Sequence, residues 1–198
     1  LPGARFVVIE AQAQSVALAR KSLRYNGLED RVDLRQFDFR SEEALAEGEA
    51  FDLITGSPPY FPLDSGFHAE HEQKLHCRFE MRGDVTDYLR VGARHLSAGG
   101  VMAIVFPVKP EHQLKRVLEG AREAGLVILR QQDVVLKEGE APLLGLFLLG
   151  RRQDYPTHWG EASDQGHHFQ DAPLTIRMRD GAVSVPYSLF KMEIGFPP

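Results

Sequence analysis

The apolar residues of the chain alternate between strand-like and helix-like segments. Phe6-Val7-Val8-Ile9 is a continuous apolar run, typical of a strand that is covered on both faces in a parallel sheet. Further strands are predicted at residues 32–37, 51–55 and 101–106. The segments between them have apolar residues at helical spacing, which predicts helices over 12–26, 84–96 and 110–124. This alternation predicts a doubly wound, mostly parallel α/β sheet.

The later part of the chain departs from this alternation. Two strand-like stretches, 126–136 and 143–149, have no long helix between them, so we expect an antiparallel hairpin at the edge of the sheet. The chain is then polar and loop-like before it alternates around Asp180-Gly181. That pattern predicts a second hairpin over residues 174–185.

Three shorter features carry further predictions. Ser41 is expected to cap a short helix with Glu42 and Glu43 in its first turn. Gly99-Gly100 is expected to end the helix that begins at residue 84. Residues 61–83 show no periodicity and are rich in histidine and charge, so we interpret them as a long functional loop or lid.

Composition indicates one globular domain. The chain has 198 residues, 43% hydrophobic and 26% charged, enough for one well-buried core. We expect a core over residues 1–151, with the polar loop and hairpin of residues 152–198 packed on it. The net charge of -5 argues against tight non-specific binding to nucleic acid, so an RNA substrate requires a local site.

No apolar run approaches the roughly 20 residues of a membrane helix. A single cysteine, Cys77, fits a reducing cytoplasm.

The motif with the clearest chemistry is Ser57-Pro58-Pro59-Tyr60, directly after a predicted buried strand. Ligands bind at the carboxyl ends of strands in open α/β sheets. Two prolines stiffen this corner, because each fixes its φ angle. The Ser57 side-chain oxygen and the Pro58 carbonyl are two acceptors that can grip the two N–H bonds of a planar amino group. That grip favours attack by a lone pair that is otherwise delocalised. Tyr60 offers a ring on which a base can stack.

Two acidic residues follow the earlier strands. Glu10 ends the first predicted strand, where a carboxylate suits ribose hydroxyls. Asp38 ends the second, where it suits an adenine amino group, with Phe39 beside the ring. An isolated acid at a strand end is more often a helix cap than a ligand. Three strand ends that carry suitable groups in this order favour a cofactor site.

These residues resemble the ordered motifs of class I S-adenosylmethionine-dependent methyltransferases, and the tetrapeptide resembles the (Asn/Asp/Ser)-Pro-Pro-(Tyr/Phe/Trp) signature for amino groups. More narrowly, the chain is similar to the bacterial tRNA(Val) (adenine-N6)-methyltransferase group. The resemblance implies a Rossmann-like fold, S-adenosyl-L-methionine as cofactor and tRNA as substrate. It implies catalytic roles for Ser57, Pro58 and Tyr60, and cofactor contacts from Glu10, Asp38, Phe39 and Ser57. The substrate contacts that it implies are Pro59, Tyr60, Phe61 and Arg78.

The sequence departs from that group in two respects. Ser57 stands where the group usually has asparagine, and its shorter side chain leaves the substrate open. No glycine-rich loop precedes Glu10, because the chain begins at what resembles the second strand. We therefore expect the first strand and roughly the first quarter of a parent protein to be absent, and cofactor binding by this chain to be weak.

Two other functions fit parts of the sequence. A protein glutamine-N5 methyltransferase uses the same tetrapeptide on an amide, and the negative charge suits it. A non-catalytic module that has lost cofactor binding would explain the absent glycine loop.

Several basic and histidine residues stay ambiguous from sequence alone. Lys74, Arg78 and Arg82 are equally consistent with phosphate contacts and with ordinary surface charge, as are Arg177, Arg179 and Lys191. His68 and His71 lack regular zinc spacing, so we expect no metal site.

Overall fold

A computed structural model describes residues 3–60, 83–156 and 167–197. Within them the chain forms an open five-stranded sheet, in the order β3-β4-β6-β5-β7, and a separate pair, β1-β2. The strands are β1 (Phe6–Ile9), β2 (Val32–Arg35), β3 (Phe51–Gly56), β4 (Leu96–Pro107), β5 (Leu126–Lys137), β6 (Leu144–Arg151) and β7 (His167–Arg177). The helices are α1 (Ala13–Asn26), α3 (Val85–His95), α4 (Glu111–Glu123) and α5 (Val185–Glu193), with a 3₁₀ turn, η2 (Arg152–Asp154).

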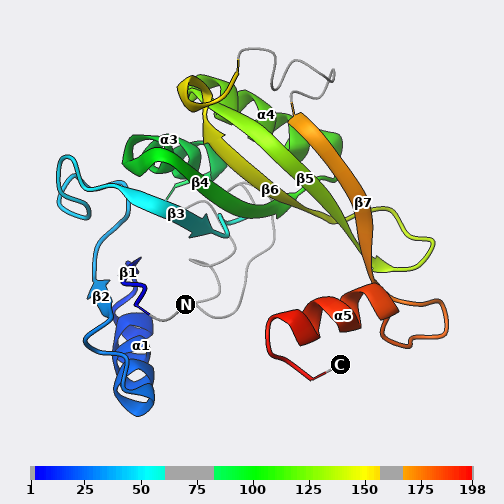
Figure 1. The fold of residues 1–198 in the computed structure, drawn as a ribbon, viewed down its shortest axis with the longest axis horizontal. Coiled ribbons are helices and arrows are strands. Elements are labelled where there is room, and N and C mark those ends of the chain that lie inside the picture. The colour runs from blue at the N-terminus through cyan, green and yellow to red at the C-terminus, as the bar shows by residue number, and fades with distance from the viewer. Residues whose placement is uncertain (1–2, 61–82, 157–166, 198) are drawn as a thin grey trace, which may run out of the picture.

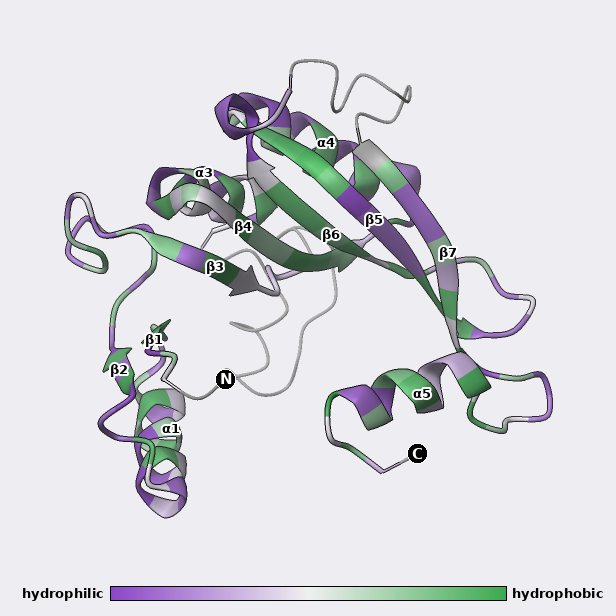
Figure 2. Cartoon of the chain, viewed as in Figure 1, coloured by the Kyte–Doolittle hydropathy of each residue, from purple (hydrophilic) through white to green (hydrophobic). Residues whose placement is uncertain are grey.

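Helices α3 and α4 cover one face of the larger sheet (Figure 1). They pack together and against β3, β4 and β5. Beneath them, alternate residues of β4 and β6 are buried, and the two strands are largely apolar along their length (Figure 2). The largest side chains of this core are Leu89, Met102, Ile104, Phe106, Phe147 and Leu149, each no more than 2% exposed. This core fixes the strand end from which the Ser57 corner leaves.

The strand pairings confirm the predicted sheet and its edge hairpin. β3 pairs with β4 in parallel, and β6 lies antiparallel between β4 and β5. β5 also pairs with β7 in parallel, so the hairpin is extended by one more strand. The result is a mixed, mostly parallel Rossmann-like sheet, as predicted.

The N-terminal unit contains β1, α1 and β2. β1 and β2 pair in parallel, with Phe6 opposite Val32, so their carboxyl ends lie at the same edge. Helix α1 ends at Asn26 and is capped by Gly27, whose φ of 62° lets its N–H donate to the Arg24 carbonyl. In Figure 1 this unit lies beside β3 rather than within the larger sheet.

Two local predictions, the helix at Ser41 and the helix stop at Gly99-Gly100, are wrong. The helix predicted at Ser41 is a series of turns, because the Ser41 hydroxyl accepts from the Glu43 amide at 3.2 Å and local side-chain bonds compete with a helix. Helix α3 ends at His95 rather than at Gly99-Gly100. Leu96 already belongs to β4, where it pairs with Phe51, and such long-range pairing is invisible in the local pattern.

The C-terminal hairpin prediction is also corrected. The turn at Asp180-Gly181 forms, but its second arm is a single bridge between Arg177 and Val183. The chain then enters α5, because Ser184 caps the helix by accepting from the Tyr187 amide and a proline follows in the first turn. The chain therefore forms a helix from Val185, where the alternating pattern predicted the end of a strand. The first arm is not a hairpin strand but β7, paired with β5.

No helix in the described part of the chain is long and apolar enough to cross a membrane.

The core yields a first prediction. Leu89 on α3 is fully buried, so we expect Leu89→Ala to lower the free energy of unfolding by about 2–5 kcal/mol through lost burial and a residual cavity. Leu18 on α1 is 65% exposed, and Leu18→Ala should change it by less than about 0.5 kcal/mol. Urea denaturation of both variants tests this. Equal effects would mean that α3 does not hold the core as described.

Candidate active site

A cavity of about 1470 Å³ lies between the N-terminal unit and β3. Its walls come from β1, β2, β3 and α3, and from the loops at their ends. It exceeds the roughly 300–1,000 Å³ typical of ligand pockets. The predicted residues among its lining are Glu10, Asp38, Phe39, Ser57 and Pro59. The fold thus brings together five of the residues that the sequence singled out.

Glu10 lies immediately after β1, and its side chain is half-buried. One carboxylate oxygen, Oε1, accepts from the Gln12 backbone N–H at 2.7 Å. This bond fixes the orientation of the side chain beside the first turn of α1. Because only Oε1 is used in this bond, the second carboxylate oxygen can accept from a further donor. A hydrogen bond to a ribose hydroxyl requires such an acceptor.

Asp38 is held by Arg40. Its two oxygens accept from the Arg40 backbone N–H and guanidinium at 2.7–3.0 Å. The bonds from the guanidinium to Asp38 raise the pKa of Arg40 above its usual value, although burial opposes the shift. Asp38 therefore has a positive partner at the cavity wall. An adenine amino group would have to share its carboxylate with Arg40.

Two aromatic rings meet beside Asp38. The Phe39 and Tyr88 ring centroids lie 4.2 Å apart, with 48° between the planes, and both residues line the cavity. Gly56, at the end of β3, admits the Tyr88 ring, because a Cβ there would lie 3.0 Å from a ring carbon. These rings form an apolar wall that suits a flat purine.

The Ser57 corner leaves β3 toward this cavity. Ser57 is exposed and its Oγ lies 3.2 Å from the Tyr60 hydroxyl. Pro58 is fully buried, so the corner is anchored by packing as well as by its fixed φ angle. A serine oxygen has two lone pairs, so Ser57 can keep its Tyr60 bond and accept one substrate N–H. The corner thus presents an oriented acceptor at the cavity.

Tyr60 lies behind the corner rather than in the cavity lining. Its ring meets Phe106 edge-on, with 5.8 Å between centroids, and packs against the core. Its carbonyl accepts from the Gln113 side-chain amide, Nε2, at 3.0 Å. The stacking role expected for Tyr60 is untested, and its ring here supports the corner through the Phe106 contact.

Of the other predicted residues, Arg177, Arg179 and Lys191 are described: Arg177 donates to the Gly181 carbonyl, Arg179 pairs with Glu138, and Lys191 lies over the Tyr187 ring. The rest lie outside the described part of the chain. Phe61 and Arg78, the other expected substrate contacts, belong to residues 61–82, as do the proposed lid, Lys74, Arg82 and both candidate metal-binding histidines. Among the residues that the structure describes, no group of three His, Cys, Asp or Glu side chains could hold a metal ion.

Two residues near the site were not predicted as functional. Tyr88 lies within the helix predicted over residues 84–96, but nothing in the sequence marked it as a cavity residue. Gln113 lies four residues before Val117 and eight before Ala121, so the glutamine occupies the buried stripe of α4. A polar side chain on an apolar stripe is the signal that could have identified it.

Comparison with solved structures identifies the fold class. A predicted O-methyltransferase from Agrobacterium tumefaciens has the same fold, with a TM-score of 0.64 over 96% of this chain and 77% of its own, at 15% sequence identity. The described chain therefore has the Rossmann-like fold of class I methyltransferases. No protein-family model matches the sequence.

Sequence similarity then points to a narrower group. The chain is 29% identical over 144 residues to a tRNA1(Val) (adenine(37)-N6)-methyltransferase from Tolumonas auensis, covering 73% of this chain and 57% of that protein. A protein of the same name from Haemophilus influenzae is 24% identical over 134 residues, covering 68% and 53%. The resemblance seen in the motifs is thus confirmed. The chain spans about half the length of the curated relatives it matches.

Proposed function

We propose that the full-length protein transfers a methyl group from S-adenosylmethionine to an exocyclic amino group in tRNA, with adenine N6 as the target. The observation that supports this most directly is the exposed Ser57 oxygen at a proline-stiffened corner beside a cavity whose lining includes Glu10 and Asp38. The relatives named tRNA adenine-N6 methyltransferases support the substrate. A base inside a helix cannot reach such a corner, so an unstacked loop nucleotide is favoured.

The chemistry of the cavity lining suits the cofactor. In this proposal Glu10 binds the ribose hydroxyls, Asp38 accepts from the adenine amino group while it keeps its bonds to Arg40, and the Phe39 and Tyr88 rings contact the flat face of the adenine. When bound, S-adenosylmethionine supplies an electrophilic methyl group on sulfur. The requirement on the protein is to place the target nitrogen beside that methyl group and to exclude water.

The Ser57 corner supplies the positioning. Ser57 Oγ and the Pro58 carbonyl accept the two N–H bonds of the amino group, which directs the nitrogen lone pair toward the methyl carbon. With the cofactor bound, the nitrogen held by this corner would take the methyl group while the sulfur would keep the electron pair of its former bond to that group. The nitrogen gains positive charge in this step, so both acceptor bonds strengthen in the transition state. The amino group then releases one proton to solvent.

Methyl transfer from isotope-labelled cofactor to unmodified tRNA by the full-length protein tests the proposal. We expect label in tRNA that digests to N6-methyladenosine. Label in a release factor and none in RNA would instead favour glutamine-N5 methylation. Absence of label in both substrates would contradict methyl transfer to either.

The second candidate function is a non-catalytic binding module that has lost cofactor binding. The exposed apolar walls of the cavity favour it. Phe6, Val8 and Leu53 line the cavity yet are 44%, 41% and 54% exposed. A wall so open to water holds a ligand weakly, because affinity requires burial of most of the ligand surface. We therefore expect the 198-residue chain to bind S-adenosylhomocysteine with a Kd weaker than about 100 μM, by calorimetry. Micromolar binding would contradict this candidate.

A further inference from the structure

We infer that Gln113 is a positioning residue for the Ser57 corner, and that Arg116 and Asp84 support it. This inference rests on the proposed function, because it assigns Gln113 a role in orienting the same acceptors. The four residues Tyr60, Gln113, Arg116 and Asp84 are called the Gln113 network below. Gln113 lies on the first turn of α4, outside the cavity lining, and only 5% of its surface is exposed.

The amide of Gln113 uses both of its ends. Its Nε2 donates to the Tyr60 carbonyl at 3.0 Å, and its Oε1 accepts from the Arg116 guanidinium at 3.0 Å. A buried amide that makes a bond at each end has a fixed orientation, since turning it over would place donor against donor. Its contact with the Tyr60 carbonyl is therefore specific.

Arg116 carries the network to helix α3. Its other terminal nitrogen lies 3.3 Å from an Asp84 carboxylate oxygen, Oδ2. The second oxygen of Asp84, Oδ1, caps α3 by accepting from the Asp87 amide at 3.0 Å. The guanidinium also lies 5.7 Å from the centroid of the Phe106 ring. Both Arg116 and Tyr60 thus rest on one core side chain.

The network joins two points that are 24 residues apart in sequence. Tyr60 ends the Ser-Pro-Pro-Tyr motif, and Asp84 begins α3. Both are tied to the same turn of α4. Tyr60 belongs to the same four-residue corner as Ser57 and Pro58, so a contact that holds its main chain also holds the backbone that carries both acceptors. Its hydroxyl lies 3.2 Å from Ser57 Oγ. Loss of the Gln113 contact should disturb the Ser57 acceptor without changing any residue that touches the cofactor.

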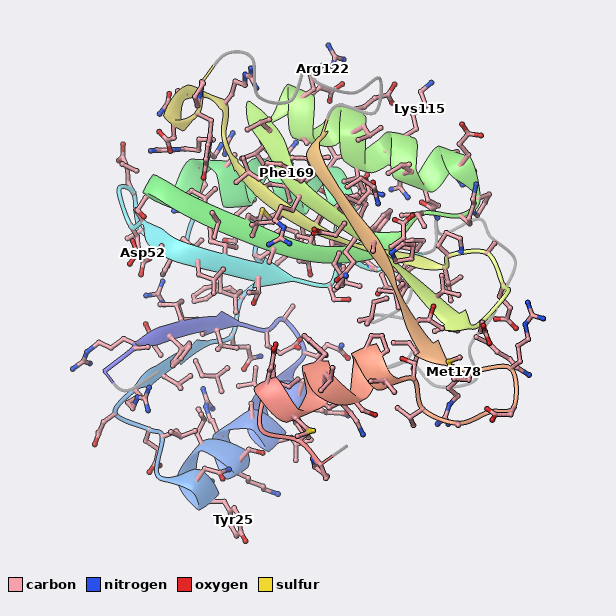
Figure 3. The ribbon with its side chains drawn as sticks, turned by 45° about the vertical axis from the view of Figure 1, so that its right-hand side comes forward. Tyr25, Asp52, Lys115, Arg122, Phe169 and Met178 are labelled. Atoms are coloured by element: carbon pink, nitrogen blue, oxygen red, sulfur yellow. The ribbon has the colours of Figure 1, made fainter. Side chains whose placement is uncertain are left out.

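Selective labelling can observe the Tyr60 carbonyl directly. Tyr60-Phe61 is the only Tyr-Phe pair in the sequence, so ¹³C-carbonyl tyrosine combined with ¹⁵N-phenylalanine gives one carbonyl–amide cross-peak. In the 198-residue chain, Gln113→Met removes the donor while roughly keeping the volume. We expect its carbonyl resonance to move upfield, as loss of a hydrogen bond requires. Lys115→Met is the matched control, because Lys115 points away from the sheet on the same helix (Figure 3) and its side chain is 70% exposed.

A second variant separates the two ends of the amide. Gln113→Glu keeps an acceptor for Arg116 but has no donor for Tyr60 when ionised, so it should shift the resonance as Gln113→Met does while preserving the fold. In the full-length protein both variants should lower kcat about tenfold with little change in the KM for cofactor. Asp84→Asn, which still caps α3, should give a smaller loss.

Different results would contradict the Gln113 inference and the proposed methyltransferase function. An unmoved Tyr60 resonance in both Gln113 variants would overturn the inference, whatever the activity. A moved resonance with unchanged kcat would overturn the positioning role and leave Gln113 as a packing residue. A moved resonance in a full-length protein that methylates no substrate would contradict the proposed function while the hydrogen bond stands.

Discussion

Replacement of Ser57 by alanine is expected to lower the kcat of the full-length protein roughly 10- to 100-fold, while the KM for cofactor changes little. The reason is the loss of one acceptor bond whose strength grows in the transition state, worth about 1–3 kcal/mol. Ser57 is exposed and hydrogen-bonded only to Tyr60 among the contacts described at this corner, so alanine should leave the fold intact. Single-turnover measurement with saturating cofactor gives the chemical rate directly.

Tyr60→Phe distinguishes the acceptor role of Ser57 from a structural one. It removes the same Ser57–Tyr60 bond, 3.2 Å in length, from the other side, yet it keeps the ring on Phe106 and the serine oxygen. We expect a loss of less than about threefold, because an exposed neutral bond contributes little. Equal losses in Ser57→Ala and Tyr60→Phe would show that Ser57 matters only through Tyr60. Ser57→Asn should retain most activity, since its amide oxygen is also an acceptor.

The fold was largely predictable where its signals are local. The helix predicted over residues 84–96 and the paired stretches of β5 and β6 appear as expected. The apolar run at Phe6–Ile9 also forms a strand, but it is not covered on both faces as predicted, because Phe6 and Val8 are 44% and 41% exposed. Each of these elements depends on residues within a few positions of one another. The parallel pairing of β5 with β7 depends on residues about 40 apart, such as Val135 and Thr175. No local pattern encodes that partner, so the sequence predicted a hairpin there instead.

In the candidate site, too, features set by local sequence were predictable and features set by long-range contacts were not. Glu10, Asp38 and Ser57 were predictable because each directly or closely follows a strand, and the fold brings strand ends together. Gln113 was not predictable, because its partner is a main-chain carbonyl 53 residues away. The partial engagement of Asp38 by Arg40 was equally hidden, although the two are neighbours in sequence. Whether such a pair bonds depends on the loop geometry after β2.

Glu10 carries the prediction with the largest effect on cofactor affinity. Glu10→Ala should raise the Kd for S-adenosylhomocysteine in the full-length protein roughly 10- to 100-fold, because hydrogen bonds to a charged acceptor contribute about 1.5–3 kcal/mol each. The variant also loses the bond from the Gln12 amide at 2.7 Å. Calorimetry with the ligand measures the change, and kcat at saturating cofactor should stay within about twofold.

The matched control for Glu10 is another carboxylate of the same cavity. Glu29 also lines it, but from the loop between α1 and β2 rather than from a strand end. If general negative charge held the cofactor, Glu29→Ala and Glu10→Ala would weaken binding alike. If the grip depends on the oxygen that the Gln12 amide orients at the end of β1, only Glu10→Ala should weaken it. A Kd unchanged in Glu10→Ala would place the ribose elsewhere, and the strand-end order that links Glu10, Asp38 and Ser57 would lose its first member.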